Sequence, residues 1–322
     1  MLWCGHLTEN QNPAIRRSVL QIIYIFKPYK ITLMLSRRSL LKKTLMLSPF
    51  MHTPLWKDLM AKNSRTRFRI GACDWSIGKG SNIEAFDVAR EIGLEGIMVD
   101  MGSPENNLHI RNKETQEAYL KASGASGIAI TSLAMGVYNR IPFHSDNRTE
   151  EWVSGSIDAT KNLGVNVLLL AFFNASDLRN DNGRKQAAVS ILKNLVARAE
   201  KQGVILGIES YLDAGEHMEI INKVGSGNLK VYYDFRNTQD AGHDAIAEFK
   251  KLKKEMICEL HMKENGSLLQ DGTLNWKDIS NAIYATGYTG NQWMQIEGAI
   301  PKGADIITSY RKNLAYLRSL FS

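Results

Sequence analysis

The 322-residue sequence predicts an α/β protein with a (β/α)8 barrel, and two observations support this fold class. From residue 68 onward, short apolar runs rich in Val, Ile and Leu alternate eight times with longer amphipathic stretches, which is the pattern of repeated strand–helix units. Eight such units in roughly 250 residues match the length of a (β/α)8 (TIM) barrel, whose active sites lie at the carboxyl ends of the strands. We therefore expect this barrel over residues 68–322, preceded by an N-terminal leader over residues 1–67.

Each expected unit begins with a strand and continues into a helix. The apolar runs predict strands over residues 69–73, 96–100, 128–133, 165–171, 204–209, 229–234, 257–261 and 293–297. The amphipathic stretches predict helices over residues 84–92, 113–122, 151–163, 184–201, 218–224, 246–254, 276–286 and 305–319. Glycines punctuate the helix ends, as C-caps favour, at Gly93, Gly124, Gly164, Gly203, Gly225 and Gly287.

An open, doubly wound sheet is the competing architecture. It would need a glycine-rich nucleotide loop after the first strand. The segment at residues 71–75, GACDW, does not match the G-x-G-x-x-G pattern of such a loop. The barrel is therefore the preferred prediction.

The charge of the chain is unevenly divided. With 44% apolar and 23% charged residues, the chain can bury a large globular core. Residues 1–67 hold 12 Lys or Arg against 2 acidic residues, and the remaining 28 basic residues face 31 acidic ones, so the leader carries +10 and the body −3. A slightly acidic body offers no basic face for DNA, and we expect no nucleic-acid partner.

The three cysteines, Cys4, Cys73 and Cys258, form no C-x-x-C pattern, and an odd number cannot all pair within one chain. Cys73 and Cys258 lie in apolar runs, where we interpret them as small buried hydrophobes and not as nucleophiles. The sequence therefore predicts no disulfide scaffold.

The leader contains a candidate export signal. Residues 36–43, SRRSLLKK, followed by apolar residues, resemble a twin-arginine signal of the S-R-R-x-F-L-K type, with Leu40 in the Phe position. Met34 is then a candidate start, and the protein is expected in the periplasm; a basic amphipathic segment and a cytoplasmic protein are the alternative. The apolar run at residues 19–26 is shorter than the roughly 20 residues that cross a bilayer, so we expect no stable membrane anchor.

Four polar residues fall near the ends of four successive apolar runs. The residues are Glu209, Asp234, His261 and Glu297, with gaps of 25, 27 and 36 residues. Each gap is long enough for a crossover that returns the chain to the same edge of a parallel sheet, so the four side chains can converge. Three carboxylates and one imidazole suit Mn²⁺, Mg²⁺ or Co²⁺ better than the thiolate-rich sets of structural zinc do. The sequence predicts one divalent ion, with Mn²⁺ preferred and Mg²⁺, Co²⁺ or Zn²⁺ as alternatives.

The motifs around these residues resemble those of a known superfamily. They are GIE at residues 207–209, YD at 233–234, HMK at 261–263 and QIE at 295–297. They are similar to those of the sugar isomerase/epimerase superfamily with a xylose-isomerase-like TIM barrel, which also contains endonuclease IV. The resemblance covers about residues 68–320, a range that is set by the length of one such barrel. It implies that the four polar residues bind one divalent ion, and that Glu209 and Glu297 flank the substrate carbon that exchanges a proton.

Two positions depart from that pattern. Ketose 3-epimerases of the superfamily tend to carry a histidine three residues after the aspartate ligand, where this chain has Asn237. They also carry a second glutamate shortly after the first ligand, and Glu216 is one place farther along than in those relatives. Glu216 could orient a sugar hydroxyl, or it could be a solvated loop charge.

The predicted chemistry is proton abstraction next to a carbonyl. A divalent cation bound to both oxygens of an α-hydroxy carbonyl stabilises the enediolate as a Lewis acid. Glu209 and Glu297 are the predicted catalytic residues, as general base and general acid on opposite sides of the carbon. The predicted substrate-binding residues are Asp74, Trp75, Glu216, Asn237 and Lys263, of which Lys263 points to the same face as His261.

The expected function is thus a metal-dependent isomerase or epimerase of a sugar or keto sugar, with a small carbohydrate as its partner. A keto-glycoside lyase or dehydratase shares the same enediolate chemistry. An endonuclease IV-like phosphodiesterase needs a histidine-rich metal cluster, whereas the body holds only five histidines. A non-catalytic sugar-binding barrel would not need two opposed glutamates. A homo-oligomer is compatible with the sequence, and export would favour a free ketose or a 3-keto-glycoside over a sugar phosphate.

Overall fold

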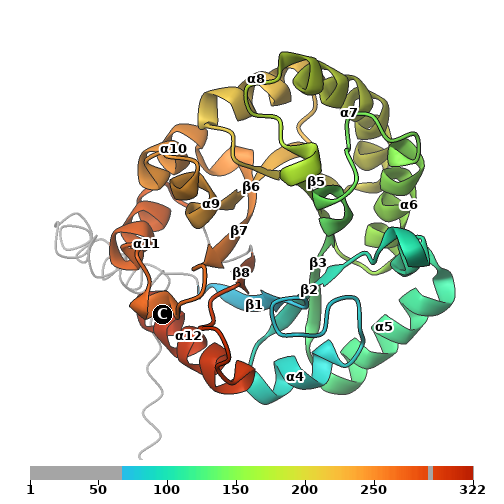
Figure 1. Ribbon diagram of the computed structural model, residues 1–322. Helices are drawn as coiled ribbons and strands as arrows, with labels where there is room; N and C mark the ends of the chain where they lie inside the picture. Colours follow the sequence, from blue (N-terminus) through green and yellow to red (C-terminus); the bar gives the residue numbers. More distant parts are fainter. Residues whose placement is uncertain (1–66, 289–292, 322) are drawn as a thin grey trace, which may run out of the picture. The chain divides into compact units, whose positions relative to one another are not determined.

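The computed structural model describes residues 67–288 and 293–321. Within these ranges, eight parallel strands close into a barrel in chain order, and β1 pairs with both β2 and β8 (Figure 1). The strands are β1 (Arg69–Cys73), β2 (Gly96–Asp100), β3 (Ala129–Met135), β4 (Val167–Phe172), β5 (Ile205–Ser210), β6 (Leu229–Asp234), β7 (Ile257–Lys263) and β8 (Trp293–Glu297). The predicted (β/α)8 barrel is confirmed, while the expected twin-arginine segment at residues 36–43 lies outside the described residues.

Helices form an outer ring around the strands (Figure 1). They are α4 (Ala85–Ile92), α5 (Lys113–Ser126), α6 (Thr149–Asn162), α7 (Asn182–Gln202), α8 (Ala214–Val224), α9 (Phe235–Asp240), α10 (Ala245–Leu252), α11 (Trp276–Ala285) and α12 (Ile306–Leu320). Among the helices in the described ranges, none combines the length and the hydropathy of a membrane span. The short helix α9 was not predicted, and it begins directly after Asp234.

The boundaries of two helices differ from the prediction for local reasons. Gly124 does not end α5; the helix continues to Ser126 and ends at Gly127, whose φ of 73° is the left-handed conformation that glycine adopts without strain. Helix α8 begins at Ala214 and not at the expected residue 218, because the Asp213 carboxylate accepts the backbone N–H of Glu216 and caps the first turn. Capping contacts therefore decide both boundaries.

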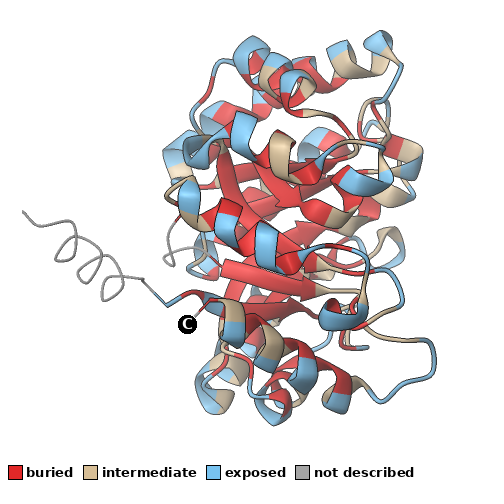
Figure 2. Ribbon diagram, turned by 90° about the vertical axis from the view of Figure 1, so that its left-hand side faces the viewer, coloured by how far each residue is buried: buried red, intermediate tan, exposed pale blue. Residues whose placement is uncertain are grey.

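The apolar core lies on both sides of the strands. Leu168, Ile208 and Trp152 are at most 1% exposed in the layer between the strands and the helices, and Met98 and Tyr232 belong to a smaller cluster inside the barrel. Figure 2 shows the strands buried and the helices exposing only their outer faces. Burial of one large apolar side chain stabilises the fold by about 1.5–3 kcal/mol. The carboxyl ends of the strands are therefore held by a continuous packed core.

Two glycines allow large side chains inside the barrel near β1 and β2. A Cβ atom added to Gly71 would lie 2.8 Å from the carbonyl oxygen of Gly96, and one added to Gly96 would lie 3.0 Å from the Trp293 ring. Neither position has room for a side chain without movement of the neighbouring backbone or ring. Close approach, and not a turn, explains these two glycines.

A polar layer fills the barrel interior below the carboxyl ends of the strands. Glu259 is 3% exposed, and its Oε2 accepts hydrogen bonds from Ser132 Oγ at 2.8 Å and Tyr232 Oη at 2.9 Å. Burial raises the pKa of Glu259 to about 7, even though these two donors act in the opposite direction. Glu259 precedes His261 by two residues on the same face of β7, so this layer lies directly beneath the predicted metal ligands.

Candidate active site

The four predicted metal ligands meet at the carboxyl end of the barrel. They come from four adjacent strands, β5 to β8, and the register pairs Asp234 with His261. One ligand-type atom from each residue lies within 4.8 Å of the others. His261 Nδ1 lies 2.9 Å from Glu209 Oε1, 3.4 Å from Glu297 Oε2 and 3.9 Å from Asp234 Oδ2. The structure thus brings together the side chains that the spacing placed at one edge.

Asn237 holds two of the carboxylates in position. Its side-chain Nδ2 donates to Glu209 Oε1 at 3.0 Å, and its backbone N–H donates to Asp234 Oδ1 at 2.9 Å. Both contacts arise because Asp234 is the N-cap of α9 and Asn237 lies in its first turn. The second oxygen of Asp234, Oδ2, is buried and accepts no hydrogen bond from the described residues.

Trp75 and Lys263 hold the fourth ligand, Glu297. Trp75 Nε1 donates to Glu297 Oε1 at 3.0 Å, and Lys263 Nζ lies 3.1 Å from Glu297 Oε2 and 3.8 Å from Asp234 Oδ2. Burial alone would raise the pKa of Glu297, but Lys263, His261 and Trp75 outweigh it and bring the pKa to about 2. Lys263 and Glu297 therefore form a charged pair at the edge of the site.

The donor set fits a divalent cation. Burial, together with the neighbouring charges of Glu209 and Glu297, raises the pKa of Asp234 to about 7, although Lys263 acts in the opposite direction. Three carboxylates this close repel one another unless positive charge lies between them. A cation would remove that repulsion and would also engage the Asp234 oxygen that accepts no hydrogen bond from the described residues. Carboxylate oxygens with a single imidazole are ligands that Mn²⁺ and Mg²⁺ accept.

His261 presents its two ring nitrogens to different neighbours. Nδ1 faces the carboxylates, whereas Nε2 lies 3.4 Å from the Sγ atom of the fully buried Cys73. Burial alone would lower the pKa of His261, but Glu209 and Glu297 hold it well above its usual value. Without an ion, the imidazolium is thus a cation among carboxylates, and ion binding at Nδ1 must release that proton.

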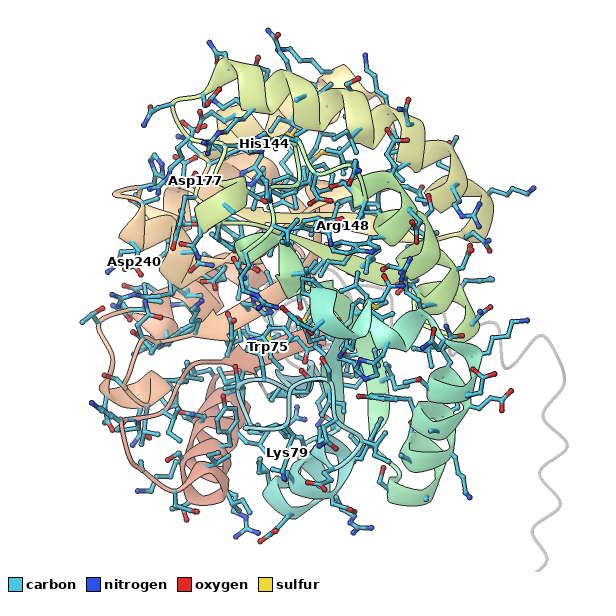
Figure 3. All side chains as sticks on the ribbon, turned by 45° about the vertical axis from the view of Figure 1, so that its right-hand side comes forward. Trp75, Lys79, His144, Arg148, Asp177 and Asp240 are labelled. Carbon is cyan, nitrogen blue, oxygen red and sulfur yellow. The ribbon has the colours of Figure 1, made fainter. Side chains whose placement is uncertain are left out.

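A cavity of about 690 Å³ opens above the four residues. Trp75, Asn237 and Lys263 line it beside Glu209 and Glu297, so the structure places three of the five predicted substrate-binding residues in it. Figure 3 shows Trp75 close to the middle of the ring of elements. The volume is in the range of sites for small molecules.

Asp74, the fourth predicted substrate-binding residue, lies behind the cavity. It is 0% exposed, and its Oδ2 accepts the backbone N–H groups of Ser81 at 2.9 Å and Asp100 at 3.1 Å. Burial raises its pKa well above the usual range, and the nearby Asp100 adds to the effect. The structure gives Asp74 the role of anchoring the loop that carries Trp75.

Glu216, the fifth, does not line the cavity either. Its Oε2 accepts the backbone N–H of Asp213 at 3.2 Å, which closes a capping box at the start of α8. Its other oxygen lies 2.5 Å from Lys185 Nζ. Both carboxylate oxygens are therefore engaged at a helix end, and the side chain does not line the cavity.

Asp100 lines the cavity although sequence reasoning did not select it. It ends β2, and its Oδ1 accepts hydrogen bonds from Ser81 Oγ at 3.0 Å and from the backbone N–H of Gly102 at 2.8 Å. Burial raises the pKa of Asp100, and these donors oppose the shift. Asp100 occupies the end of a predicted strand, as the four candidate ligands do, so the same signal could have identified it.

Comparison with known proteins agrees with this geometry. A family model described as xylose isomerase-like TIM barrel matches residues 86–320. The 2-epi-5-epi-valiolone 7-phosphate 2-epimerase of an Actinoplanes species is 23% identical over 61% of this chain and 72% of that protein. A putative L-ribulose-5-phosphate 3-epimerase of Escherichia coli K12 is 26% identical over 48% of this chain and 57% of that protein.

Solved structures show the same fold. The D-psicose 3-epimerase of Clostridium cellulolyticum H10, solved with D-tagatose, superposes with a TM-score of 0.67 at 15% identity, and covers 79% of this chain and 100% of that one. This chain therefore belongs to the xylose isomerase-like TIM barrel family. Both curated relatives are named as epimerases, the second as a putative one, and this chain is an enzyme of the same kind.

Proposed function

We propose that this protein is a divalent-metal-dependent isomerase or epimerase that moves a proton at the carbon next to the carbonyl of a sugar or keto sugar. One observation carries the proposal. Glu209 and Glu297 are both largely buried, both lie within 3.4 Å of His261 Nδ1, and both line a cavity large enough for a sugar. Binding alone would not require two such glutamates.

The ion would be held by Glu209, Asp234, His261 and Glu297, with Mn²⁺ preferred for this oxygen-rich set. When bound, it supplies Lewis acidity toward the oxygens of an α-hydroxy carbonyl and so makes the adjacent C–H bond more acidic. All remaining steps belong to side chains of the protein.

Glu209 is the penultimate residue of β5 and Glu297 the last residue of β8, which are the first and the last of the four strands that build the centre. A substrate carbon above the centre would lie between them, so one carboxylate can remove its proton while the other returns a proton. Return to the opposite face of the same carbon gives epimerisation, and delivery to the neighbouring carbon gives isomerisation. Each proton carrier is expected to contribute about 10²–10⁴-fold to the rate.

Trp75 and Lys263 would orient the reacting groups. The indole N–H fixes one oxygen of Glu297, and the indole ring lines the cavity as an apolar wall for a sugar face. The ammonium group of Lys263 lies beside Glu297 and Asp234, where it balances their charge and can donate to a substrate oxygen.

A keto-glycoside lyase or dehydratase is the second candidate, because the same carbanion can expel a neighbouring leaving group in place of taking a proton. A phosphodiesterase of the endonuclease IV kind has less support. It needs several metal-binding histidines, and His261 is the only histidine in the one candidate metal cluster found among the described residues.

We also propose that the protein is exported to the periplasm, on the basis of the SRRSLLKK segment alone. Twin-arginine export carries folded proteins, which suits an enzyme that must acquire its ion first. A free sugar or a glycoside is then a better substrate than an intracellular phosphate ester.

Proton exchange with solvent tests the proposed chemistry. Metal-loaded protein is incubated with a panel of keto sugars in D₂O, and the products are examined by NMR. Incorporation of deuterium at a carbon next to the carbonyl is expected for at least one sugar. Absence of exchange for every sugar, together with tight binding of one of them, would favour a non-catalytic sugar-binding barrel.

A further inference from the structure

The cavity extends away from the candidate metal centre toward the ends of β2 and β3. We call this part the distal lobe, and it is lined by Ser81, Asp100, Ser103, Asn106, Asn139 and Arg140. The candidate metal centre, in contrast, is built from β5 to β8. The distal lobe therefore offers room for the other end of a substrate whose carbonyl lies at the metal centre.

The charges of the distal lobe do not suit an anionic group. Asp100 is a partly buried residue that lines the cavity, and its carboxylate already accepts hydrogen bonds from Ser81 Oγ and from the backbone N–H groups of Gly102 and Gly136. Arg140 is the only cationic side chain among the lining residues of the lobe; its guanidinium lies 3.4 Å from Glu105 and its side chain is 59% exposed. Phosphate sites usually gather an excess of Arg, Lys or backbone N–H donors. Here the one cation already lies beside the Glu105 carboxylate at the surface, and Asp100 adds a carboxylate to the wall.

The same lobe does suit hydroxyl groups. A hydroxyl can donate to Asp100 in a charge-assisted hydrogen bond, which is stronger than a neutral one. Asn106 uses its Oδ1 to accept the backbone N–H of Ser103, so its amide N–H₂ is left to donate. The Asn139 side chain, which is partly buried, takes part in no hydrogen bond found within the described residues. Acceptors and donors are thus both available, as vicinal hydroxyls require.

We propose that the distal lobe binds a neutral polyhydroxy group, either the polyol tail of a ketose or a second sugar ring, and that Asp100 disfavours a phosphate at that end. This inference rests on the proposed function, because it assumes that a sugar carbonyl lies at the metal centre. The proposed preference for a neutral group differs from the phosphorylated substrates that appear in the names of the two curated relatives.

Three probes with the same ketose head test the proposal. D-fructose, D-fructose 6-phosphate and isomaltulose, in which glucose is attached to O6 of fructose, differ only at the end remote from the carbonyl. Their binding to the Mn²⁺-loaded full chain is measured by isothermal titration calorimetry. We expect D-fructose 6-phosphate to bind at least about tenfold more weakly than D-fructose. Isomaltulose binding as tightly as fructose would indicate a second sugar ring, and weaker isomaltulose binding a polyol tail.

Two variants test the cause of that difference. Asp100→Asn removes the carboxylate charge, and Asn139→Lys adds a cation to the lobe without removing any observed hydrogen bond. In each variant the affinity ratio of fructose 6-phosphate to fructose should rise, by about tenfold for Asn139→Lys, which corresponds to one charge-assisted contact. Asn222→Lys, an exposed position on α8, is the matched control and should leave the ratio unchanged.

The proposal is overturned if wild type binds fructose 6-phosphate as tightly as fructose, if none of the three probes binds, or if neither variant changes the ratio. These outcomes are separate from failure of the proposed function. Deuterium exchange with a strong preference for phosphorylated sugars would refute the neutral subsite alone. The expected affinity order without any exchange would refute the catalytic proposal alone.

Discussion

The thiol of Cys73 lies 3.4 Å from Nε2 of His261, on the opposite edge of the ring from the carboxylates that face Nδ1. An imidazole binds an ion through a nitrogen that carries no proton, so the proton of a metal-bound His261 must be on Nε2, and Cys73 is its acceptor. In most metal sites this acceptor is a carboxylate or a backbone carbonyl. A thiol is a weaker acceptor, so Cys73 orients the ring without strongly increasing its basicity.

Removal of the Cys73 thiol should therefore weaken metal binding. We expect Cys73→Ala to reduce Mn²⁺ affinity by about 10–100-fold, as loss of outer partners of metal-bound histidines does, and Cys73→Ser to retain more of it. Calorimetric titration with Mn²⁺ measures the effect. Cys258→Ala is a matched control, because Cys258 is equally buried and donates to the carbonyl of Val231. Equal affinities of Cys73→Ala and wild type would show that the thiol does not position His261.

The two glutamates should be needed for turnover more than for binding. Glu209→Gln and Glu297→Gln keep the side-chain size and an oxygen ligand but remove the basic carboxylate, so the transition state loses more than the ground state does. Turnover and deuterium exchange should fall by about 10²–10⁴-fold in each variant. Glu216→Gln, whose carboxylate lies in the α8 capping box, should retain turnover. Two glutamine variants within a fewfold of wild type would point to another proton carrier, with Lys263 the next to test.

Stability should fall in acid because of His217. Its Nδ1 lies 2.9 Å from the Asp213 carbonyl oxygen and must donate, so Nε2 accepts from Ser210 Oγ at 2.9 Å and the ring is neutral. Burial lowers its pKa from 6.5 to about 4. Above pH 6.5, His217 is neutral in both the folded and the unfolded chain. Between pH 6.5 and pH 4, the unfolded chain binds a proton at His217 and the folded chain does not. The unfolding free energy therefore decreases as the pH falls from 6.5 to 4.

Urea unfolding of wild type and His217→Asn at pH 7.5 and pH 5 measures this effect. Wild type should lose about 2 kcal/mol more unfolding free energy between these pH values than the variant does. Subtracting the loss of unfolding free energy in the variant from that in wild type removes the contributions of all other titrating groups. An identical loss in both proteins would mean that His217 has the same pKa in the folded and the unfolded chain.

Export is tested on the leader. Changing Arg37 and Arg38 to Lys should trap the protein in the cytoplasm, because twin-arginine signals depend on the arginine pair. Cell fractionation followed by immunoblotting measures the distribution. A single change of Lys57 to Arg, outside the motif, is the control. Wild-type protein found in the cytoplasm would remove the export-based argument against phosphorylated substrates.

Most of the fold could be predicted from the sequence, because the apolar runs and amphipathic stretches that indicate strands and helices are local and repeated. The eight strands could be predicted from apolar runs alone, and β1, β2, β6 and β8 have the expected bounds. Helix α9 was missed because it has only six residues, too few for an amphipathic period to be visible. Gly124 was mistaken for the helix end. The residue that takes the left-handed conformation is the one that follows the last helical turn, and here it is Gly127, whose N–H donates to the Ser123 carbonyl oxygen.

For the candidate site, too, one part could be predicted from the sequence and another part could not. Strand-end spacing predicted that Glu209, Asp234, His261 and Glu297 would converge, since each lies at the same edge of the barrel. The contacts that hold them, such as Asn237 to Glu209, cross 28 residues and depend on how α9 folds. The same limit applies to Glu216, whose cap with Asp213 becomes visible only when the start of α8 is known.

Metal analysis tests the central claim most directly. Protein purified without chelators, loaded with Mn²⁺ and desalted is analysed by inductively coupled plasma mass spectrometry, beside an Asp234→Ala, His261→Ala double variant and a Glu216→Gln control. The account predicts about one divalent ion per chain in wild type and control, and almost none in the double variant. No bound ion in wild type, or full retention by the double variant, would contradict it.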